Sequence, residues 1–296
     1  MPNAVSIHFD PNSQTLLNFL LAFIMFGVAL DLQWSDITRA VRRPKPTLLG
    51  LASQFILLPA ATFILAYFWH PTPGLALGMF LVAACPGGTV SNFMSSLAKA
   101  DLGLSVTLTA ISTLLCVLFT PFNFEFWSGL YLETENLLKS VSLDVVELFR
   151  TVFLFLILPV LVGMLVRARK PMLTTKIMKP IRWVSMLIFL AFILVAFLNN
   201  KDNFIAYSEL ALVLVVLHNL LAFVIGYAVG KVGGLGEAAS RSICIETGIQ
   251  NSALGLVICF KFFPEIGEMA LLCAMWGIWH IISGMGIAAV WSRINP

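Results

Sequence analysis

Nine apolar segments, each about the length that crosses a lipid bilayer as a helix, occupy most of this chain of 296 residues. Charged residues make up only 11% of the sequence, whereas soluble domains carry roughly 25%. A chain with 59% apolar residues cannot cover that surface in water, and it is far too apolar to be disordered. We therefore expect an all-α, polytopic membrane protein. The predicted spans are 15–30, 47–69, 74–98, 102–121, 145–166, 183–198, 205–229, 239–260 and 266–291.

Basic residues are distributed unevenly between the two sets of loops that these spans create. Lys139, Arg150, Lys201 and Lys261 fall on one side, and the other fourteen of the 18 Lys and Arg residues fall on the opposite side. The positive-inside rule makes the second side cytoplasmic. The N-terminus is then outside and the C-terminus inside, which requires an odd number of spans. We expect a multi-pass protein of the cell (inner) membrane.

Two of the predicted spans carry polar, glycine-containing interruptions near their centres. The third is interrupted by Pro86-Gly87-Gly88 and the eighth around Gly248, and the two spans run in opposite directions because they are five spans apart. The preceding spans are also polar, with Gln54 in one and His218-Asn219 in the other. Single Pro-Gly kinks are common in membrane helices. A matched pair of interruptions instead indicates an inverted-repeat transporter with its site near the bilayer midplane.

Glu246 is the one acidic residue near the middle of a predicted span. The other fourteen of the 15 Asp and Glu residues lie in loops or near span ends. A charge at the bilayer centre costs about 2.5–3.5 kcal/mol on insertion scales, so such a residue is a functional candidate. The alternative is a protonated glutamate that is hydrogen-bonded to a neighbouring helix.

Side-chain oxygens surround these interruptions and share one chemistry. The residues are Ser91 and Asn92 after the first interruption, Gln250 and Asn251 after the second, and Ser105, Thr109 and Ser112 on one helix face. Hydroxyl and amide oxygens with one carboxylate suit a hard monovalent cation and do not suit zinc. The N-termini of broken helices favour an anion. Serine and threonine side chains also often hydrogen-bond to the backbone of their own helix. This is the alternative interpretation for Ser105, Thr109 and Ser112.

His280 lies among apolar residues within the last predicted span, and His218 has a similar setting. A lone histidine there is either a satisfied core residue or, in a transporter cavity, a hydrogen-bond donor to an anionic substrate. The sequence leaves both interpretations open.

Several stretches resemble the signatures of the bile acid:sodium symporter family. They are Ala84-Cys85-Pro86-Gly87-Gly88-Thr89-Val90-Ser91-Asn92, the run from Leu104 to Leu114, Ile245-Glu246-Thr247-Gly248-Ile249-Gln250-Asn251-Ser252, Met25-Phe26-Gly27, Gln54 and the run from Trp279 to Gly284. The resemblance extends over about residues 16–291. It implies a single transporter unit over 1–296, in which a core domain with two crossing broken helices packs against a panel domain. The core would be about 47–122 and 205–291, and the panel about 15–31 and 145–199.

The resemblance also implies two sodium sites and a substrate cavity. Matched by motif, the first sodium site would use Ser91, Asn92, Ser105, Thr109 and Glu246. The second would use Gln54, Glu246, Thr247, Ile249 and Gln250, with Thr247 and Ile249 contributing backbone carbonyls. Thr89, Asn251 and His280 would face the substrate. The nine-span arrangement with an external N-terminus resembles that of the animal members, whereas bacterial members often have ten spans.

We therefore expect a sodium-coupled symporter of an organic anion, such as a bile acid, a steroid sulfate or a small carboxylate, that works by alternating access. The alternative is a proton-coupled or uncoupled anion carrier of the same fold. An enzyme is disfavoured because the sequence has no HExxH motif and no pair of intramembrane aspartates. The expected partners are two Na⁺ ions, the organic anion and the lipid bilayer. A net charge of +3 gives no indication of nucleic-acid binding. The oligomeric state stays open, with a monomer expected.

Overall fold

The computed structural model describes residues 33–134, 145–199 and 201–295, together with Leu137 and positions 19, 20, 22, 23, 25–27, 29 and 30. Positions 15–18, 21, 24 and 28 of the predicted first span, 15–30, and all of the segment 135–144 except Leu137 therefore lie outside the described residues. The described part is helical, and its β-type pairing is one isolated antiparallel bridge between Gly87 and Gln250. Five of its helical stretches are long and apolar enough to cross a membrane: Pro44–Trp69, Leu102–Leu130, Phe149–Arg169, Ser208–Val232 and Gly267–Ser292.

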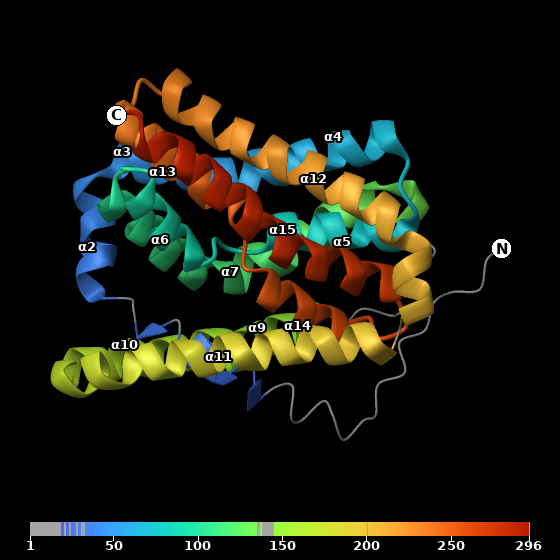
Figure 1. The fold of residues 1–296 in the computed structure, drawn as a ribbon, viewed down its shortest axis with the longest axis horizontal. Helices are drawn as coiled ribbons and strands as arrows, with labels where there is room; N and C mark the ends of the chain where they lie inside the picture. Colours follow the sequence, from blue (N-terminus) through green and yellow to red (C-terminus); the bar gives the residue numbers. More distant parts are fainter. Residues whose placement is uncertain are drawn as a thin grey trace.

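The helices form one bundle in which chain-distant segments lie side by side. Their bounds are α2 (Trp34–Arg42), α3 (Pro44–Ala52), η1 (Ser53–Leu57), α4 (Leu58–Trp69), α5 (Pro73–Ala84), α6 (Val90–Leu97), α7 (Leu102–Leu130), α9 (Val145–Val152), η2 (Phe153–Ile157), α10 (Leu158–Arg169), α11 (Pro171–Asn199), α12 (Lys201–Val232), α13 (Glu237–Gly248), α14 (Ser252–Phe262) and α15 (Gly267–Ser292). In the view of Figure 1, α12 and α11 lie on opposite sides, with α5, α6, α7 and α15 between them.

Two π-helical turns, η1 and η2, interrupt otherwise continuous helices just before Pro59 and Pro159. Proline lacks an N–H and its ring clashes with the carbonyl one turn earlier, so a wider turn relieves the clash. Such turns occur often at functional sites. Here η1 carries Gln54, whose side chain is completely buried.

The two predicted interruptions are real breaks, and they cross each other. Helix α5 ends at Ala84 and α6 begins at Val90, while α13 ends at Gly248 and α14 begins at Ser252. Where they cross, the N–H of Gly88 donates to the carbonyl of Ile249 and the N–H of Asn251 donates to the carbonyl of Pro86, both at 2.8 Å. Each break thus satisfies backbone groups that the other would leave unpaired inside a membrane.

Two helices extend further than their apolar patterns predict. Helix α7 continues through Pro121 to Leu130, because Phe124 beyond the proline is buried in the core. Helix α11 begins at Pro171, twelve residues before the predicted start at position 183, and its first turns carry exposed lysines. Hydropathy marks only the apolar part of a helix, so these polar ends were missed.

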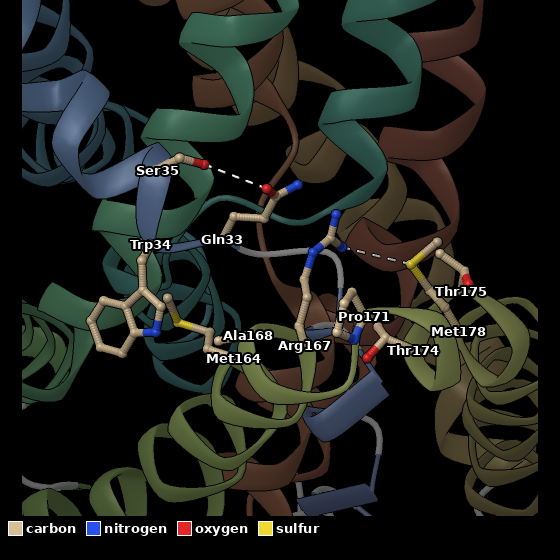
Figure 2. A pocket seen from close by; sticks show the side chains of 10 residues that line it. All are labelled: Gln33, Trp34, Ser35, Met164, Arg167, Ala168, Pro171, Thr174, Thr175 and Met178. Atoms are coloured by element: carbon tan, nitrogen blue, oxygen red, sulfur yellow. Dashed lines mark hydrogen bonds between the residues drawn. The ribbon is translucent and has the colours of Figure 1, made fainter.

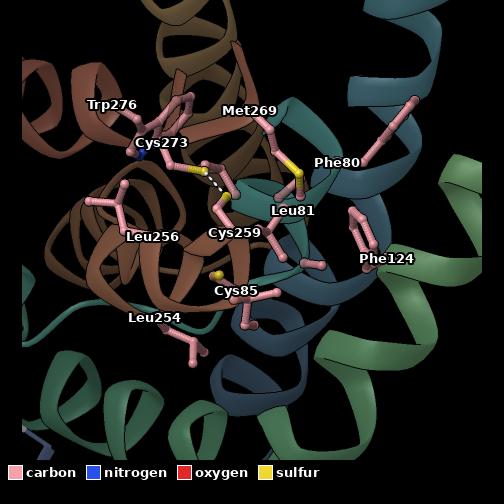
Figure 3. Packing of buried hydrophobic residues seen from close by; sticks show 14 of the residues in the cluster. Phe80, Leu81, Cys85, Phe124, Leu254, Leu256, Cys259, Met269, Cys273 and Trp276 are labelled. Atoms are coloured by element: carbon pink, nitrogen blue, oxygen red, sulfur yellow. Dashed lines mark hydrogen bonds between the residues drawn. The ribbon is translucent and has the colours of Figure 1, made fainter. Parts of the chain in front are cut away.

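The largest apolar core lies where α5, α7, α14 and α15 meet (Figure 3). Phe80, Phe124, Cys259 and Trp276 are among its buried side chains. Gly78 allows the close packing of α5 on α15, because a Cβ there would lie 2.9 Å from the Cβ of Leu272. All five cysteines are buried and free, as small apolar core residues.

Candidate functional site

Glu246 lies on α13 two residues before the break, and its side chain is 2% exposed. Three hydroxyl groups donate to its carboxylate: Ser91 to Oε2 at 2.6 Å, Ser105 to Oε2 at 3.2 Å and Thr109 to Oε1 at 2.7 Å. Ser91 comes from α6, and the other two come from α7. A buried carboxylate is tolerated only when it is paired or well hydrogen-bonded, and these three donors meet that need.

Asn92 completes this group. Its Oδ1 lies 3.0 Å from the hydroxyl of Ser105 and 3.3 Å from that of Thr109, so it is a second acceptor within reach of both hydroxyl groups. The five residues predicted for the first sodium site therefore lie together around one point. Each hydroxyl oxygen has lone pairs as well as a proton, so the same oxygens that now bond to the carboxylate can ligate a cation. Ser112, on the same face of α7, instead bonds to the carbonyl of Thr109 in its own helix.

A second group of polar atoms lies on the other side of Glu246. The Nε2 of Gln54 is 3.4 Å from the carbonyl of Glu246, and the Nε2 of Gln250 donates to the carbonyl of Thr247 at 2.8 Å. Both amide oxygens, Oε1 of Gln54 and Oε1 of Gln250, are buried and have no hydrogen-bond partner among the described residues. A buried acceptor without a donor is costly, and a bound cation would satisfy such an oxygen.

The crossing allows no side chain at Gly87. A Cβ added there would collide with Oε1 of Glu246 and with Nε2 of Gln54. The glycine therefore lets one break come into direct contact with the carboxylate that projects from the other. Residues of both predicted groups, Glu246 and Gln54, thus lie beside the same glycine.

The three residues predicted to face the substrate have different settings. Thr89 is partly exposed in the first break. Asn251 is also partly exposed, its Oδ1 accepts from the N–H of Leu254 at the start of α14, and its Nδ2 lies 3.8 Å from the sulfur of Met25. His280 on α15 is 5% exposed, and its Nδ1 has no partner among the described residues. Among the described residues, Nδ1 of His280 is thus unpaired and Nδ2 of Asn251 has only a weak sulfur contact.

Three further residues support the breaks and were not assigned a role from the sequence. Ser53 lies 2.8 Å from the hydroxyl of Thr247. Asn219 donates to the carbonyl of Gly248 at 2.7 Å, which caps the end of α13, and Ser283 in turn donates to Oδ1 of Asn219 at 2.6 Å. The polar pair His218-Asn219 in an apolar span was the available signal for Asn219. Nothing in the sequence pattern singled out Ser53 or Ser283.

His218 belongs to a different contact. Its Nε2 lies 2.7 Å from the hydroxyl of Thr62, and that hydroxyl also lies 2.8 Å from the carbonyl of Leu58. Because the threonine has one proton and gives it to the carbonyl, His218 must donate from Nε2. It is a core histidine that joins α12 to α4.

A polytopic helical bundle with two crossing broken helices, and a buried carboxylate surrounded by oxygen ligands at the crossing, has the architecture of an ion-coupled membrane transporter. The comparisons with known proteins agree with this class. A sequence model of the Sodium Bile acid symporter family matches residues 18–207, and the chain belongs to that family of transporters.

Curated relatives cover nearly the whole chain. It is 30% identical over 277 residues to the uncharacterized sodium-dependent transporter YocS of Bacillus subtilis, which covers 94% of this chain and 83% of the relative. It is 30% identical to the probable chloroplastic sodium/metabolite cotransporter BASS1 of Arabidopsis thaliana, over 93% of this chain and 66% of the relative. It is 27% identical to human sodium/bile acid cotransporter 4, over 88% of this chain and 59% of the relative.

Proposed function

We propose that this protein is a sodium-coupled symporter of an organic anion and works by alternating access. The observation that carries the proposal is the set of oxygens around Glu246, above all the two unpartnered amide oxygens of Gln54 and Gln250. Oxygen ligands with one carboxylate fit Na⁺, the cation named in the relatives' descriptions. The transported anion is a bile acid, a steroid sulfate or a small carboxylate.

We assign two sodium sites by the match to the family's motifs. The first consists of Ser91, Asn92, Ser105, Thr109 and Glu246, and the second of Gln54, Glu246, Thr247, Ile249 and Gln250. Glu246 belongs to both, so the two ions share one carboxylate. The bound ions hold the breaks together, and the ordered crossing then presents helix N-termini, Thr89, Asn251 and His280 to the anion.

The alternating movement uses the two domains implied by the family resemblance. The core, about 47–122 and 205–291, rocks against the panel, about 15–31 and 145–199. We assign nine spans in two inverted repeats, with the N-terminus outside and the C-terminus in the cytoplasm, and a monomer as the working unit. The charge asymmetry of the loops supports this orientation.

The energetics allow strong accumulation. A tenfold sodium gradient supplies about 1.4 kcal/mol per ion. One net positive charge that moves through 100 mV adds about 2.3 kcal/mol. Two sodium ions with one monovalent anion thus supply roughly 5 kcal/mol, enough for a several-thousand-fold concentration ratio.

The second candidate is a proton-coupled or uncoupled carrier of the same fold. It rests on Glu246, which has three hydroxyl donors and no basic partner among the described residues, and which could carry a proton instead of facing a sodium ion.

Uptake into proteoliposomes separates these candidates. The purified protein is reconstituted, and uptake of labelled organic anions is measured with an inward gradient of sodium, of potassium, or of protons with potassium. Sodium coupling predicts accumulation in the first condition only. Equal uptake with sodium and potassium would refute it, and accumulation driven by the proton gradient alone would favour the second candidate. A thermal-shift screen of organic anions, with and without sodium, identifies the substrate class.

A further inference from the structure

A run of basic residues lies where α10 leads into α11. Between positions 167 and 182 the sequence has six basic residues and no acidic one: Arg167, Arg169, Lys170, Lys176, Lys179 and Arg182. The apolar span Phe149–Arg169 ends within this run, so the charges lie at the edge of the membrane. Clusters of this size beside a span attract anionic lipid surfaces.

A pocket opens at the same place, between α2, α10 and the start of α11 (Figure 2). Its volume is about 400 Å³, and its polar lining includes Gln33, Ser35, Arg167, Thr174 and Thr175. None of the described residues that line it carries a carboxylate. Within the described residues, the pocket is therefore a concave site lined by one positive charge, and the proposed transport mechanism does not use it.

Arg167 supplies the charge. Figure 2 shows its guanidinium and the carboxamide of Gln33 directed toward the same space. One Nη group donates to the carbonyl of Leu30 and contacts the sulfur of Met178 at 3.9 Å. Its Nε and other Nη group have no hydrogen-bond partner within the described part of the chain. A guanidinium with free N–H groups is suited to bind a phosphate through two parallel hydrogen bonds.

The rim of the pocket has the mixed character of a membrane interface. Trp34, which also lines it, is 50% exposed, and tryptophan is enriched at the headgroup level of membranes. Met172 and Leu173, at the start of α11, are 79% and 44% exposed. Exposed apolar side chains next to a cationic pocket allow acyl chains and a charged headgroup to bind together.

We propose that this pocket binds the phosphate of an anionic phospholipid headgroup, with Arg167 as the main ligand. The lipid ties α2 to α10 and α11 at the membrane edge that carries most of the basic residues. A lipid fits better than a soluble anion, because the pocket lies at the end of a span and has apolar neighbours for the acyl chains. The proposal does not depend on sodium coupling or on the identity of the transported anion.

The test measures lipid-dependent thermal stability of the full chain, purified in a neutral detergent. Phosphatidylglycerol, phosphatidylcholine with the same acyl chains, and inorganic phosphate are titrated separately. We expect phosphatidylglycerol to raise the melting temperature at concentrations at least about tenfold lower than phosphatidylcholine, and phosphate to have no effect at the same concentrations. Equal effects of the two lipids would overturn the proposal. Stabilisation by phosphate alone would show a soluble-anion site and would also overturn it.

Variants locate the effect. Arg167→Gln should raise the half-saturating concentration of phosphatidylglycerol by about tenfold, the loss of one charge-assisted hydrogen bond. Arg169→Gln removes the same charge two residues away but outside the pocket lining, and it should change that concentration less than about threefold. Equal losses in both variants would mean diffuse attraction without a site. If Arg167→Gln does not fold, Arg167→Lys serves instead. Lysine keeps the positive charge but cannot form the two parallel hydrogen bonds of a guanidinium. Unchanged lipid affinity in this variant would therefore refute the role of Arg167.

Discussion

The hydroxyl of Ser91 lies 2.6 Å from Oε2 of Glu246, although 155 positions separate the two residues in the chain. One belongs to the helix that follows the first break, and the other to the helix that precedes the second. This contact joins the two broken helices through a side chain, beside the two backbone hydrogen bonds of the crossing. Any ligand that binds to the Glu246 carboxylate therefore acts on both breaks at once.

Replacement of Glu246 by glutamine removes the charge and keeps the size of the side chain. A bond to a charged group contributes about 1.5–3 kcal/mol, so the sodium concentration for half-maximal uptake should rise about 10- to 100-fold. The measurement is initial uptake in proteoliposomes as a function of sodium. Glu265→Gln, at an exposed position, is the matched control and should behave like the unaltered protein. Sodium dependence that survives unchanged in Glu246→Gln would remove both proposed sites.

Gln54→Leu removes one of the two unpartnered amide oxygens and keeps the side chain's approximate volume. Loss of one ligand from the second site should raise the half-maximal sodium concentration about tenfold and lower the Hill coefficient toward one. Thr62→Val is the control, because it removes a buried hydroxyl that contacts His218 rather than the site. A Hill coefficient that stays above one in Gln54→Leu would contradict the assignment of Gln54.

Gly87→Ala should abolish transport, because its Cβ would occupy space taken by the Glu246 carboxylate and the Gln54 amide. The Glu246 carboxylate and the Gln54 amide would have to leave their present positions, and sodium-dependent thermal stabilisation should disappear together with uptake. Gly286→Ala adds the same methyl group within α15, where nothing lies within 4 Å, and should be neutral or slightly stabilising, by at most about 1 kcal/mol. Normal uptake in Gly87→Ala would show that the close approach is not needed.

Arg241 holds together the ends of several helices, and its side chain is 2% exposed. It pairs with Glu237 at 3.0 Å and donates to the carbonyls of Ala98, Trp291 and Ile294. Arg241→Met leaves these carbonyls without their donor, at a cost of about 1–3 kcal/mol for each buried acceptor.

The melting temperature of Arg241→Met in detergent should therefore fall by at least about 5 °C. Arg293→Met, at an exposed position, should shift it by less than about 2 °C. If the two variants melt alike, Arg241 does not hold these helix ends together.

Much of the architecture was predictable because hydropathy is a local property of the chain. Pro86-Gly87-Gly88 predicted the first break, since proline interrupts a helix and the two glycines that follow are poor helix formers. The Gly248 region predicted the second break, and both occur where expected. The end of α7 beyond position 121 was missed because it is held by the packing of Phe124 in the core. The start of α11 before position 183 was missed because it is largely exposed and carries lysines, so hydropathy does not mark it.

The candidate site was predictable residue by residue only through the family resemblance. Without the resemblance, the sequence pattern pointed to Glu246, because a single acidic residue near the middle of an apolar span is exceptional. The roles of Ser53 and Ser283 could not be read from the sequence, because serine is common in membrane helices and most such residues bond to their own backbone.

The sequence by itself determined the class of the protein, the places where two helices break and the one acid that lies within a span. These follow from the cost of placing charges and unpaired backbone groups in lipid, which each segment incurs on its own. Only the tertiary structure decided that Ser91, Ser105 and Thr109 meet Glu246, across 137 to 155 positions of the chain. Such contacts depend on how the helices rotate and cross, and the pattern of a single segment does not specify either.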